Sequence, residues 1–164
     1  MTPFNHRANG LVGAAFRLRT MYGEVICDGN HSTPAALNLF FMSKGPDYSI
    51  MVTDALMAKG TPIGSKHIFG GNEIVIYPDG SAHLVEAGNL AGSTLKVNEG
   101  LKILIEDALV PVTYAINSCT LNPAHCLGIA DRKGSIRVGR DADLVVLDDD
   151  YAVIQTYCMG QPQL

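Results

Sequence analysis

The stretches EVICDGNH (residues 24–31) and YSIMVTD (residues 48–54) set the fold class, because each is an apolar run that ends in titratable side chains. The segment between them, residues 34–44, begins with a proline and is followed by Gly45-Pro46, as expected of a helix. Nearly continuous apolar strands joined by a helix are typical of parallel βα units with both faces covered. The sequence therefore predicts an α/β fold with its chemistry at the carboxyl ends of the strands.

Further elements follow from turn residues and from apolar spacing. Pro78-Asp79-Gly80 is a turn signal between two short apolar runs, so it predicts an antiparallel hairpin of residues 73–77 and 81–85. The other predicted helices cover residues 11–21 (stopped by Gly23), 94–109, a segment beginning at Pro111, and a short segment with Asn122 as its cap and Gly128 just past its end. Three last strands are predicted over residues 136–138, 144–147 and 152–157.

Length and composition limit the architecture. A chain of 164 residues with 47% hydrophobic and 17% charged residues is long and apolar enough to bury a core, which excludes a disordered segment. A closed (β/α)8 barrel needs about 250 residues. The chain is therefore either a small open α/β domain or part of something larger.

Charge and cysteine usage limit the partners and the compartment. The net charge is −4 and the cations are not clustered, so neither a nucleic acid nor a membrane is expected as a partner. The sequence opens without an apolar signal region, and no apolar stretch approaches 18 residues. Four scattered cysteines without a C-x-x-C pair are interpreted as reduced, buried thiols, which predicts a cytoplasmic protein.

Asp54 and His31 are the first candidates for chemistry. Each follows an apolar strand, and the ends of neighbouring parallel strands meet at one edge of a sheet. A carboxylate buried at such a position is suited to general acid or base work. The alternatives are that Asp54 caps the following loop and that His31 is a structural residue, and position alone leaves both open.

Two loops offer groups for binding. Arg7 lies in a glycine-flanked loop, where a guanidinium can bind an anion such as phosphate or simply face solvent. The backbone amides of Leu90, Ala91 and Gly92 precede a predicted helix and either bind a polar ligand or turn the chain. The remaining histidines have no partner at metal-ligand spacing.

Six motifs together resemble the N-acetylglucosamine-6-phosphate deacetylase family of the amidohydrolase superfamily. In order, they are Asp28-Gly29-Asn30-His31, Val52-Thr53-Asp54-Ala55, Phe69-Gly70-Gly71, Asn89-Leu90-Ala91-Gly92-Ser93, Asn122-Pro123-Ala124, and a last segment from Gly134 that ends in Ala142-Asp143-Leu144-Val145-Val146-Leu147. The resemblance covers essentially the whole chain. It implies the C-terminal portion of a TIM barrel, with the two runs as barrel strands 7 and 8, plus part of a small β-sandwich.

The resemblance also implies a division of the chain. Residues 1–70 match the last βα units of a partial TIM barrel, and residues 71–92 match a β-hairpin with a loop that lines the site. Residues 93–130 match a helical segment of the barrel, and residues 131–164 match the strands of the sandwich.

The activity implied is hydrolysis of the acetamide of N-acetylglucosamine 6-phosphate, which gives glucosamine 6-phosphate and acetate with the help of a divalent metal, commonly zinc. Asp54 matches the aspartate that takes a proton from water and returns it to the leaving amine. Asp28, Gly29, Asn30 and His31 match a segment that contacts the sugar, as do Leu90, Ala91 and Gly92 through their backbone. Arg7 matches the arginine that binds phosphate. A homo-oligomer is expected for the full-length protein.

Two departures from the family pattern affect these expectations. Arg7 is followed by Ala-Asn-Gly instead of Glu-Pro-Gly. The family's metal ligands, a glutamate and two histidines, would fall before Met1, so the chain is expected to bind no catalytic metal and to be inactive alone. The alternatives are another metal-dependent amidohydrolase, dihydroorotase-like or deaminase-like, and a non-catalytic remnant that binds a sugar phosphate.

Overall fold

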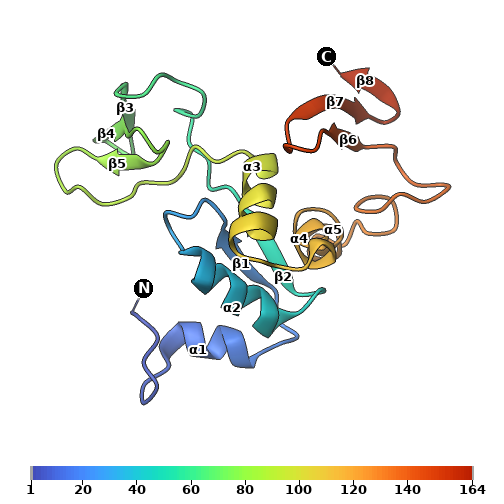
Figure 1. The fold of residues 1–164 in the computed structure, drawn as a ribbon, viewed down its shortest axis with the longest axis horizontal. Helices are drawn as coiled ribbons and strands as arrows, with labels where there is room; N and C mark the ends of the chain where they lie inside the picture. Colours follow the sequence, from blue (N-terminus) through green and yellow to red (C-terminus); the bar gives the residue numbers. More distant parts are fainter. Residues whose placement is uncertain (1, 164) are drawn as a thin grey trace.

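Two parallel strands, β1 (Gly23–Ile26) and β2 (Ser49–Val52), form the centre of the molecule (Figure 1). This computed structural model describes residues 2–163. The strands pair in register from Gly23 with Ser49 to Ile26 with Val52, which confirms the predicted parallel unit. Helix α2 (Pro34–Lys44) connects them, as the sequence predicts. Its start is fixed by Thr33, whose hydroxyl accepts a hydrogen bond from the Ala36 amide at 3.3 Å.

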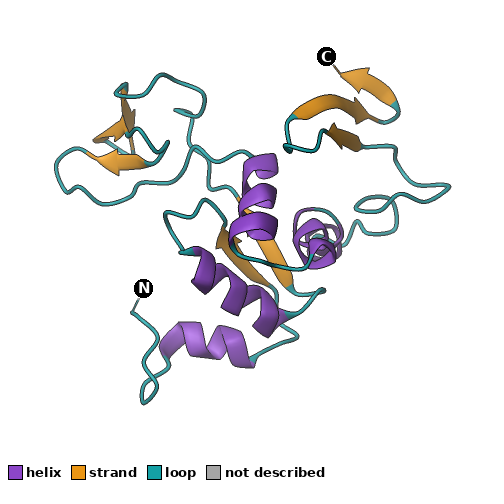
Figure 2. Cartoon of the chain, viewed as in Figure 1, coloured by secondary structure: helices purple, strands orange, loops and turns teal. Residues whose placement is uncertain are grey.

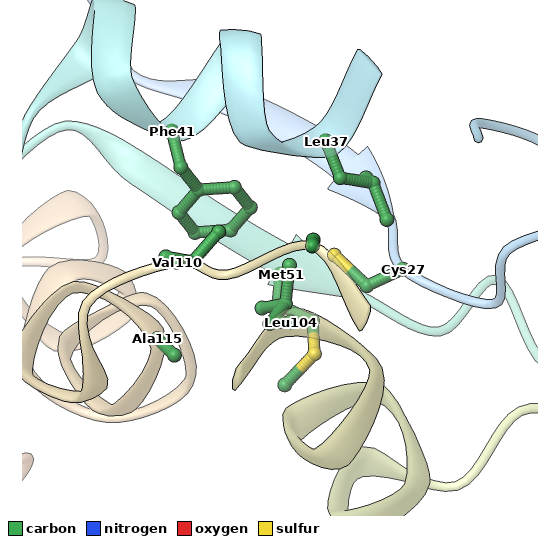
Figure 3. Close-up of a cluster of buried hydrophobic side chains, with 8 residues drawn as sticks. Cys27, Leu37, Phe41, Met51, Leu104, Val110 and Ala115 are labelled. Atoms are coloured by element: carbon green, nitrogen blue, oxygen red, sulfur yellow. The ribbon is translucent and has the colours of Figure 1, made fainter. Parts of the chain in front are cut away.

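One face of this sheet carries the main hydrophobic core (Figure 3). Leu37 and Phe41 point from α2 toward Met51 of β2. Because side chains alternate along a strand, Glu24, Ile26, Ile50 and Val52 lie on the opposite face. There Ile50 is buried, but Glu24 is exposed and Ile26 and Val52 are only half-buried. The expectation that both faces are covered is therefore fully met on one face only.

The predicted helix over residues 94–109 is shorter and irregular. It consists of α3 (Val97–Lys102), followed by a π-helical turn, η1 (Ile103–Asp107). Gly100 allows a close approach to the sheet, because an added Cβ would lie 2.7 Å from Sδ of Met51. The helix ends before Leu109, whose backbone has a φ of 53°.

Helices α4 (Val112–Cys119) and α5 (Leu121–Cys126) follow. Pro111 precedes the first turn of α4, and the residue before α5 is Thr120, so the prediction that Asn122 is a helix cap is wrong. Asn122 is fully buried instead, and its amide donates to the carbonyls of Pro46 and Ser49 at 2.9 and 2.8 Å.

Helix α1 (Gly10–Arg17) is also shorter than predicted. The expected stop at Gly23 is wrong, because the chain turns after Leu18 and Gly23 opens β1. The buried ammonium of Lys44 fixes this turn by donating to the carbonyls of Leu18 and Met21 at 2.9 and 2.8 Å. Among the described residues, the helices are all too short or too polar to cross a membrane.

A separate antiparallel sheet contains the predicted hairpin (Figure 2). Strands β4 (Asn72–Ile76) and β5 (Ala82–Leu84) pair around the Pro78-Asp79-Gly80 turn, which confirms the prediction. Strand β3 (Lys66–Phe69) was not predicted, because it lies in a glycine-rich stretch. A second, smaller core of buried apolar side chains lies on one face of this sheet: Ala58, Ile74, Ile76, Ala82 and Ala91.

The third sheet contains β6 (Leu144–Leu147), β7 (Val153–Cys158) and β8 (Gln161–Gln163). The strand predicted over residues 136–138 is wrong, since that segment is a loop with Ile136 and Val138 exposed. Ion pairs that Arg132 and Lys133 form with Asp141 hold the ends of the loop together, at 2.7 and 3.0 Å.

All four cysteines are free thiols, but they are not all buried as expected. Cys27 is buried and Cys119 is half-buried, and in both cases desolvation is the main cause that raises the thiol pKa, to about 11 for Cys119. Cys126 and Cys158 are exposed, because they lie at the ends of α5 and β7, away from the cores.

Candidate active site at the ends of the parallel strands

The carboxyl ends of β1 and β2 lie side by side, since Ile26 pairs with Val52. The loop Asp28–His31 leaves one strand end and Asp54 follows the other. The structure therefore places these candidates at the same edge of the parallel sheet, as the sequence predicts.

Asp28 organises its loop and orients His31. One carboxylate oxygen, Oδ1, accepts hydrogen bonds from the amides of Asn30 and His31, both at 2.9 Å. The other, Oδ2, lies 2.7 Å from Nδ1 of His31, and the two side chains are only 8% and 22% exposed. An imidazole held through Nδ1 presents Nε2 to a ligand, as in other carboxylate–histidine pairs.

The degree of burial of Asp54 differs from the expectation. The predicted burial is wrong: the residue is exposed, because β2 ends at an open edge of the two-stranded sheet. Its backbone has a φ of 49°, which is uncommon for a residue other than glycine. Within residues 2–163, its carboxylate accepts no hydrogen bond, so the alternative of a loop cap is not observed.

The segment Leu90–Ser93 is joined directly to the end of β2. The Ser93 amide donates to the Asp54 carbonyl at 2.9 Å, and the Leu56 amide donates to the Ser93 carbonyl at 2.8 Å. The Ser93 hydroxyl also donates to the Thr53 carbonyl. Gly92 permits this approach, because an added Cβ would lie 3.1 Å from the Asp54 carbonyl oxygen. Asp54 and the predicted backbone segment 90–92 are thus brought together.

Arg7 is not brought into contact with the other candidates. It lies in an exposed turn between Asn5 and Ala8, and its backbone amide donates to Oδ1 of Asn5 at 2.9 Å. Its guanidinium takes part in no hydrogen bond or ion pair with residues 2–163.

A cleft of about 430 Å³ adjoins the site, and the sequence patterns gave no indication of most of its lining residues. Asp28 and Asn30 line one part of the cleft and the hairpin turn at residues 78–81 lines another. The rest of the lining comes from residues 94–96, Glu99, Ile103, Gly60 and Ile63. The Pro78-Asp79-Gly80 signal predicted the turn, but nothing in it indicated which surface the turn faces.

The described residues do not fit a metal ion. Over residues 2–163, no group of three or more His, Cys, Asp and Glu side chains is arranged to hold one.

Comparison with known proteins identifies the family. The amidohydrolase family model matches residues 48–162. An N-acetylglucosamine-6-phosphate deacetylase of Bacillus subtilis (strain 168) is 42% identical over 160 residues, which are 98% of this chain and 40% of the relative. An N-acetylgalactosamine-6-phosphate deacetylase of Escherichia coli O157:H7 is 34% identical over 161 residues, with 98% of this chain and 42% of the relative covered.

The fold is shared with solved structures as well. The crystal structure of N-acetylglucosamine-6-phosphate deacetylase from Pasteurella multocida matches with a TM-score of 0.91 at 29% identity, over 99% of this chain and 42% of that one. The chain thus spans about two-fifths of the length of the relatives named here. With more than half of its residues matched by the family model, the chain belongs to the amidohydrolase family.

Proposed function

We propose that this chain forms part of the active site of a deacetylase that hydrolyses the acetamide of an N-acetylhexosamine 6-phosphate to the free amine and acetate. The observation that carries the proposal is the bonding of segment 90–93 to the end of β2, beside Asp54 and in the same chain as the Asp28–His31 pair. The names of the relatives support the substrate class.

Asp54 is the proposed proton carrier. In amide hydrolysis a general base takes a proton from the attacking water, and the same group then gives it to the leaving nitrogen, so that the C–N bond breaks to an amine. An exposed carboxylate without an internal hydrogen-bond partner is free to do both.

The other candidates are proposed to bind the sugar phosphate. His31, oriented by Asp28, offers Nε2 to a sugar hydroxyl. The backbone of Leu90, Ala91 and Gly92 lines the sugar next to Asp54. Arg7 is proposed for the phosphate, since a guanidinium binds it with two hydrogen bonds.

The chain alone is proposed to be inactive. A divalent metal in this family would polarise the acetamide and activate water, and residues 2–163 contain no arrangement that fits one. We also propose that β1 and β2 are neighbouring strands of a larger barrel, because one face of their sheet is incompletely covered.

A chimera tests the proposal. The segment of the Bacillus subtilis relative that aligns with this chain is replaced by residues 1–164, and acetate release from N-acetylglucosamine 6-phosphate is measured with zinc present. The proposal predicts release by the chimera and none by the 164-residue chain alone. A folded chimera without activity would contradict it, and release by the chain alone would contradict the proposed inactivity.

The same assay separates the alternatives. Because the relatives include an N-acetylgalactosamine-6-phosphate deacetylase, the galacto epimer is assayed in parallel to find the preferred sugar. A non-catalytic remnant predicts sugar-phosphate binding by the chain without acetate release from the chimera. A deaminase-like or dihydroorotase-like enzyme predicts no release from either sugar.

A further inference from the structure

Ser93 bonds to the backbone on both sides of Asp54. Its hydroxyl donates to the Thr53 carbonyl, and its amide donates to the Asp54 carbonyl at 2.9 Å. Only 2% of Ser93 is exposed, so water does not replace either contact. A single residue, 40 positions after Thr53 in the sequence, therefore holds both carbonyls that flank the Cα atom of Asp54.

These two carbonyls belong to the two peptide planes that meet at the Cα atom of Asp54. The plane of the Thr53–Asp54 peptide sets φ of Asp54, and the plane of the Asp54–Ala55 peptide sets its ψ. Together the two angles fix the direction in which the Cα–Cβ bond leaves the backbone. Because the exposed Asp54 carboxylate accepts no hydrogen bond within residues 2–163, the backbone decides where this side chain starts and which way it is aimed.

The Thr53–Asp54 plane has one hydrogen-bond partner among the described residues 2–163, the Ser93 hydroxyl. The Asp54 amide donates to no acceptor there, and the Thr53 carbonyl accepts from no second donor. The Thr53 hydroxyl accepts from the Ala55 amide at 3.4 Å, but that amide belongs to the second plane. Without the Ser93 hydroxyl, the first plane would have no partner in this part of the chain.

The direction of the Ser93 hydroxyl proton follows from its neighbours. The Ser93 oxygen accepts from the Leu95 amide at 3.1 Å, and the Thr53 carbonyl can only accept. The single hydroxyl hydrogen therefore points to Thr53. Because the hydroxyl is bonded on both sides, it keeps one orientation and is suited to hold a neighbouring peptide.

The backbone of Asp54 is in a conformation that needs such a partner. Its φ of 49° lies in the left-handed region, which costs a residue with a Cβ about as much free energy as one hydrogen bond contributes. Rotation of the Thr53–Asp54 plane would return φ to the ordinary negative range. This rotation changes ψ of Thr53 and φ of Asp54 and leaves the next plane in place. The backbone bonds that join Ser93 to Asp54 and Leu56 therefore do not prevent it.

We infer that Ser93 is a positioning residue whose hydroxyl holds the Thr53–Asp54 peptide and so keeps Asp54 in its left-handed conformation. That the carboxylate aimed in this way carries a proton in amide hydrolysis rests on the proposed function. The conformation itself is a property of this chain, and it is measured without any activity.

NMR spectroscopy of the 164-residue chain tests the conformation. At positive φ the amide proton and the Hα proton of one residue lie close together, so the NOE between them is strong. We expect a strong NOE for Asp54 in the parent chain and a weak one in Ser93→Ala. Ser118→Ala is the matched control, since that buried hydroxyl also donates to a backbone carbonyl, of Ala115 at 2.7 Å, and its loss should leave the NOE strong.

A strong Asp54 NOE in folded Ser93→Ala overturns the inference. Ser93→Cys keeps it testable if Ser93→Ala does not fold, because a thiol occupies a similar position but is only a weak donor. In that variant the Asp54 NOE should be weaker than in the parent chain. An NOE equal to that of the parent chain also overturns the inference.

The Bacillus subtilis chimera tests whether the Ser93–Thr53 bond serves Asp54. Ser93→Ala should lower kcat for acetate release about tenfold with KM nearly unchanged, as one hydrogen bond is lost. In a chimera that already carries Asp54→Asn, the same change should not lower kcat further, because the group that it positions is gone. An equal fall in both backgrounds, or a rise in KM alone, overturns the positioning role.

The two measurements separate this inference from the proposed function. If the parent chimera releases no acetate while Ser93→Ala still weakens the Asp54 NOE in the 164-residue chain, the proposed function fails and the role of Ser93 in holding Asp54 stands. If the chimera is active and the NOE is unchanged by Ser93→Ala, the proposed function stands and the inference about Ser93 fails.

Discussion

Single buried side chains hold the parallel unit together at points where the backbone lacks partners. Asn122 reaches from α5 to two carbonyls near the start of β2, and Lys44 reaches from α2 to two carbonyls after α1. A buried carbonyl without a donor costs about 1–3 kcal/mol. These polar side chains therefore stabilise the connections between elements that the apolar core does not reach.

Replacement of Asn122 by alanine should lower the free energy of unfolding by about 2–3 kcal/mol, because the buried Ser49 carbonyl loses its side-chain donor and the Pro46 carbonyl loses the shorter of its two bonds. Asn117→Ala is the matched control, since that amide makes one long bond of 3.4 Å to the same Pro46 carbonyl. Asn117→Ala should lower the free energy of unfolding by less than about 1 kcal/mol. If urea unfolding shows an equal loss of unfolding free energy for Asn122→Ala and Asn117→Ala, the role given to Asn122 is contradicted.

The lowered pKa of the Asp79 carboxyl predicts that the stability of the fold depends on pH. Hydrogen bonds from Ser81 lower the pKa of its carboxyl in the folded state, so this carboxylate stabilises the fold above the unfolded value of about 3.9 and stops doing so as pH falls through the folded pKa. Asp79→Asn should therefore be less stable than the parent chain at pH 6, and the difference should shrink below pH 4. Asp149→Asn, in the β6–β7 loop, should show no such trend; a pH-independent difference for Asp79→Asn would refute this account.

Among the helices and strands, those whose formation depends on residues close together in the sequence were the ones that the sequence predicted. The β1–α2–β2 unit was predictable because its apolar runs, its capping region and the Gly45-Pro46 stop all act within a few residues. The hairpin followed from its turn residues in the same way. The strand expected over residues 136–138 failed because Ile136 and Val138 have β propensity but find no neighbouring strand to pair with.

The candidate site was predictable only in part, for a similar reason. The position of Asp54 and His31 after strands indicated a shared edge, but their roles came from the family resemblance. The contact of Ser93 with the end of β2, beside the exposed Asp54, joins segments 40 residues apart in the sequence. Such pairings carry no local signal.

Gly92 tests the junction between the two site segments. Gly92→Ala adds a Cβ that would lie 2.7 Å from Cδ2 of Leu56 and 3.1 Å from the Asp54 carbonyl oxygen, at a φ of 63°. Gly60→Ala carries a comparable cost in φ, at 82°, but its Cβ meets nothing within 4 Å. We expect thermal unfolding to show that Gly92→Ala lowers the free energy of unfolding by about 2–3 kcal/mol and that Gly60→Ala lowers it by about 1 kcal/mol. A smaller loss at Gly92 than at Gly60 would argue against a tight junction.

The whole molecule consists of a central α/β unit with two antiparallel sheets that stand apart on either side of α3 (Figure 1). The β6–β8 sheet exposes large apolar side chains, among them Val145 at 60% and Ile154 at 61%. Its residues belong to neither of the two hydrophobic clusters found among residues 2–163. A surface of this kind favours association.

The 164-residue chain should therefore self-associate, and a double substitution of Val145 and Ile154 by lysine should reduce this association at equal folded content. Sedimentation velocity over a concentration series measures the change, with circular dichroism to confirm the fold. Substitution of the exposed Val112 on α4 by lysine serves as the control and should have a smaller effect. If the 164-residue chain remains a monomer at high concentration, the exposed apolar sheet does not drive self-association and the prediction is wrong.

The role of the Asp54 carboxylate is decided by one kinetic comparison in the Bacillus subtilis chimera. Asp54→Asn keeps the shape of the side chain but removes the base, so kcat for acetate release should fall by about 10²–10⁴ while KM changes little. Asp149→Asn should leave both constants unchanged. An Asp54→Asn chimera that keeps its kcat, or loses only its affinity for the sugar phosphate, would contradict the assignment.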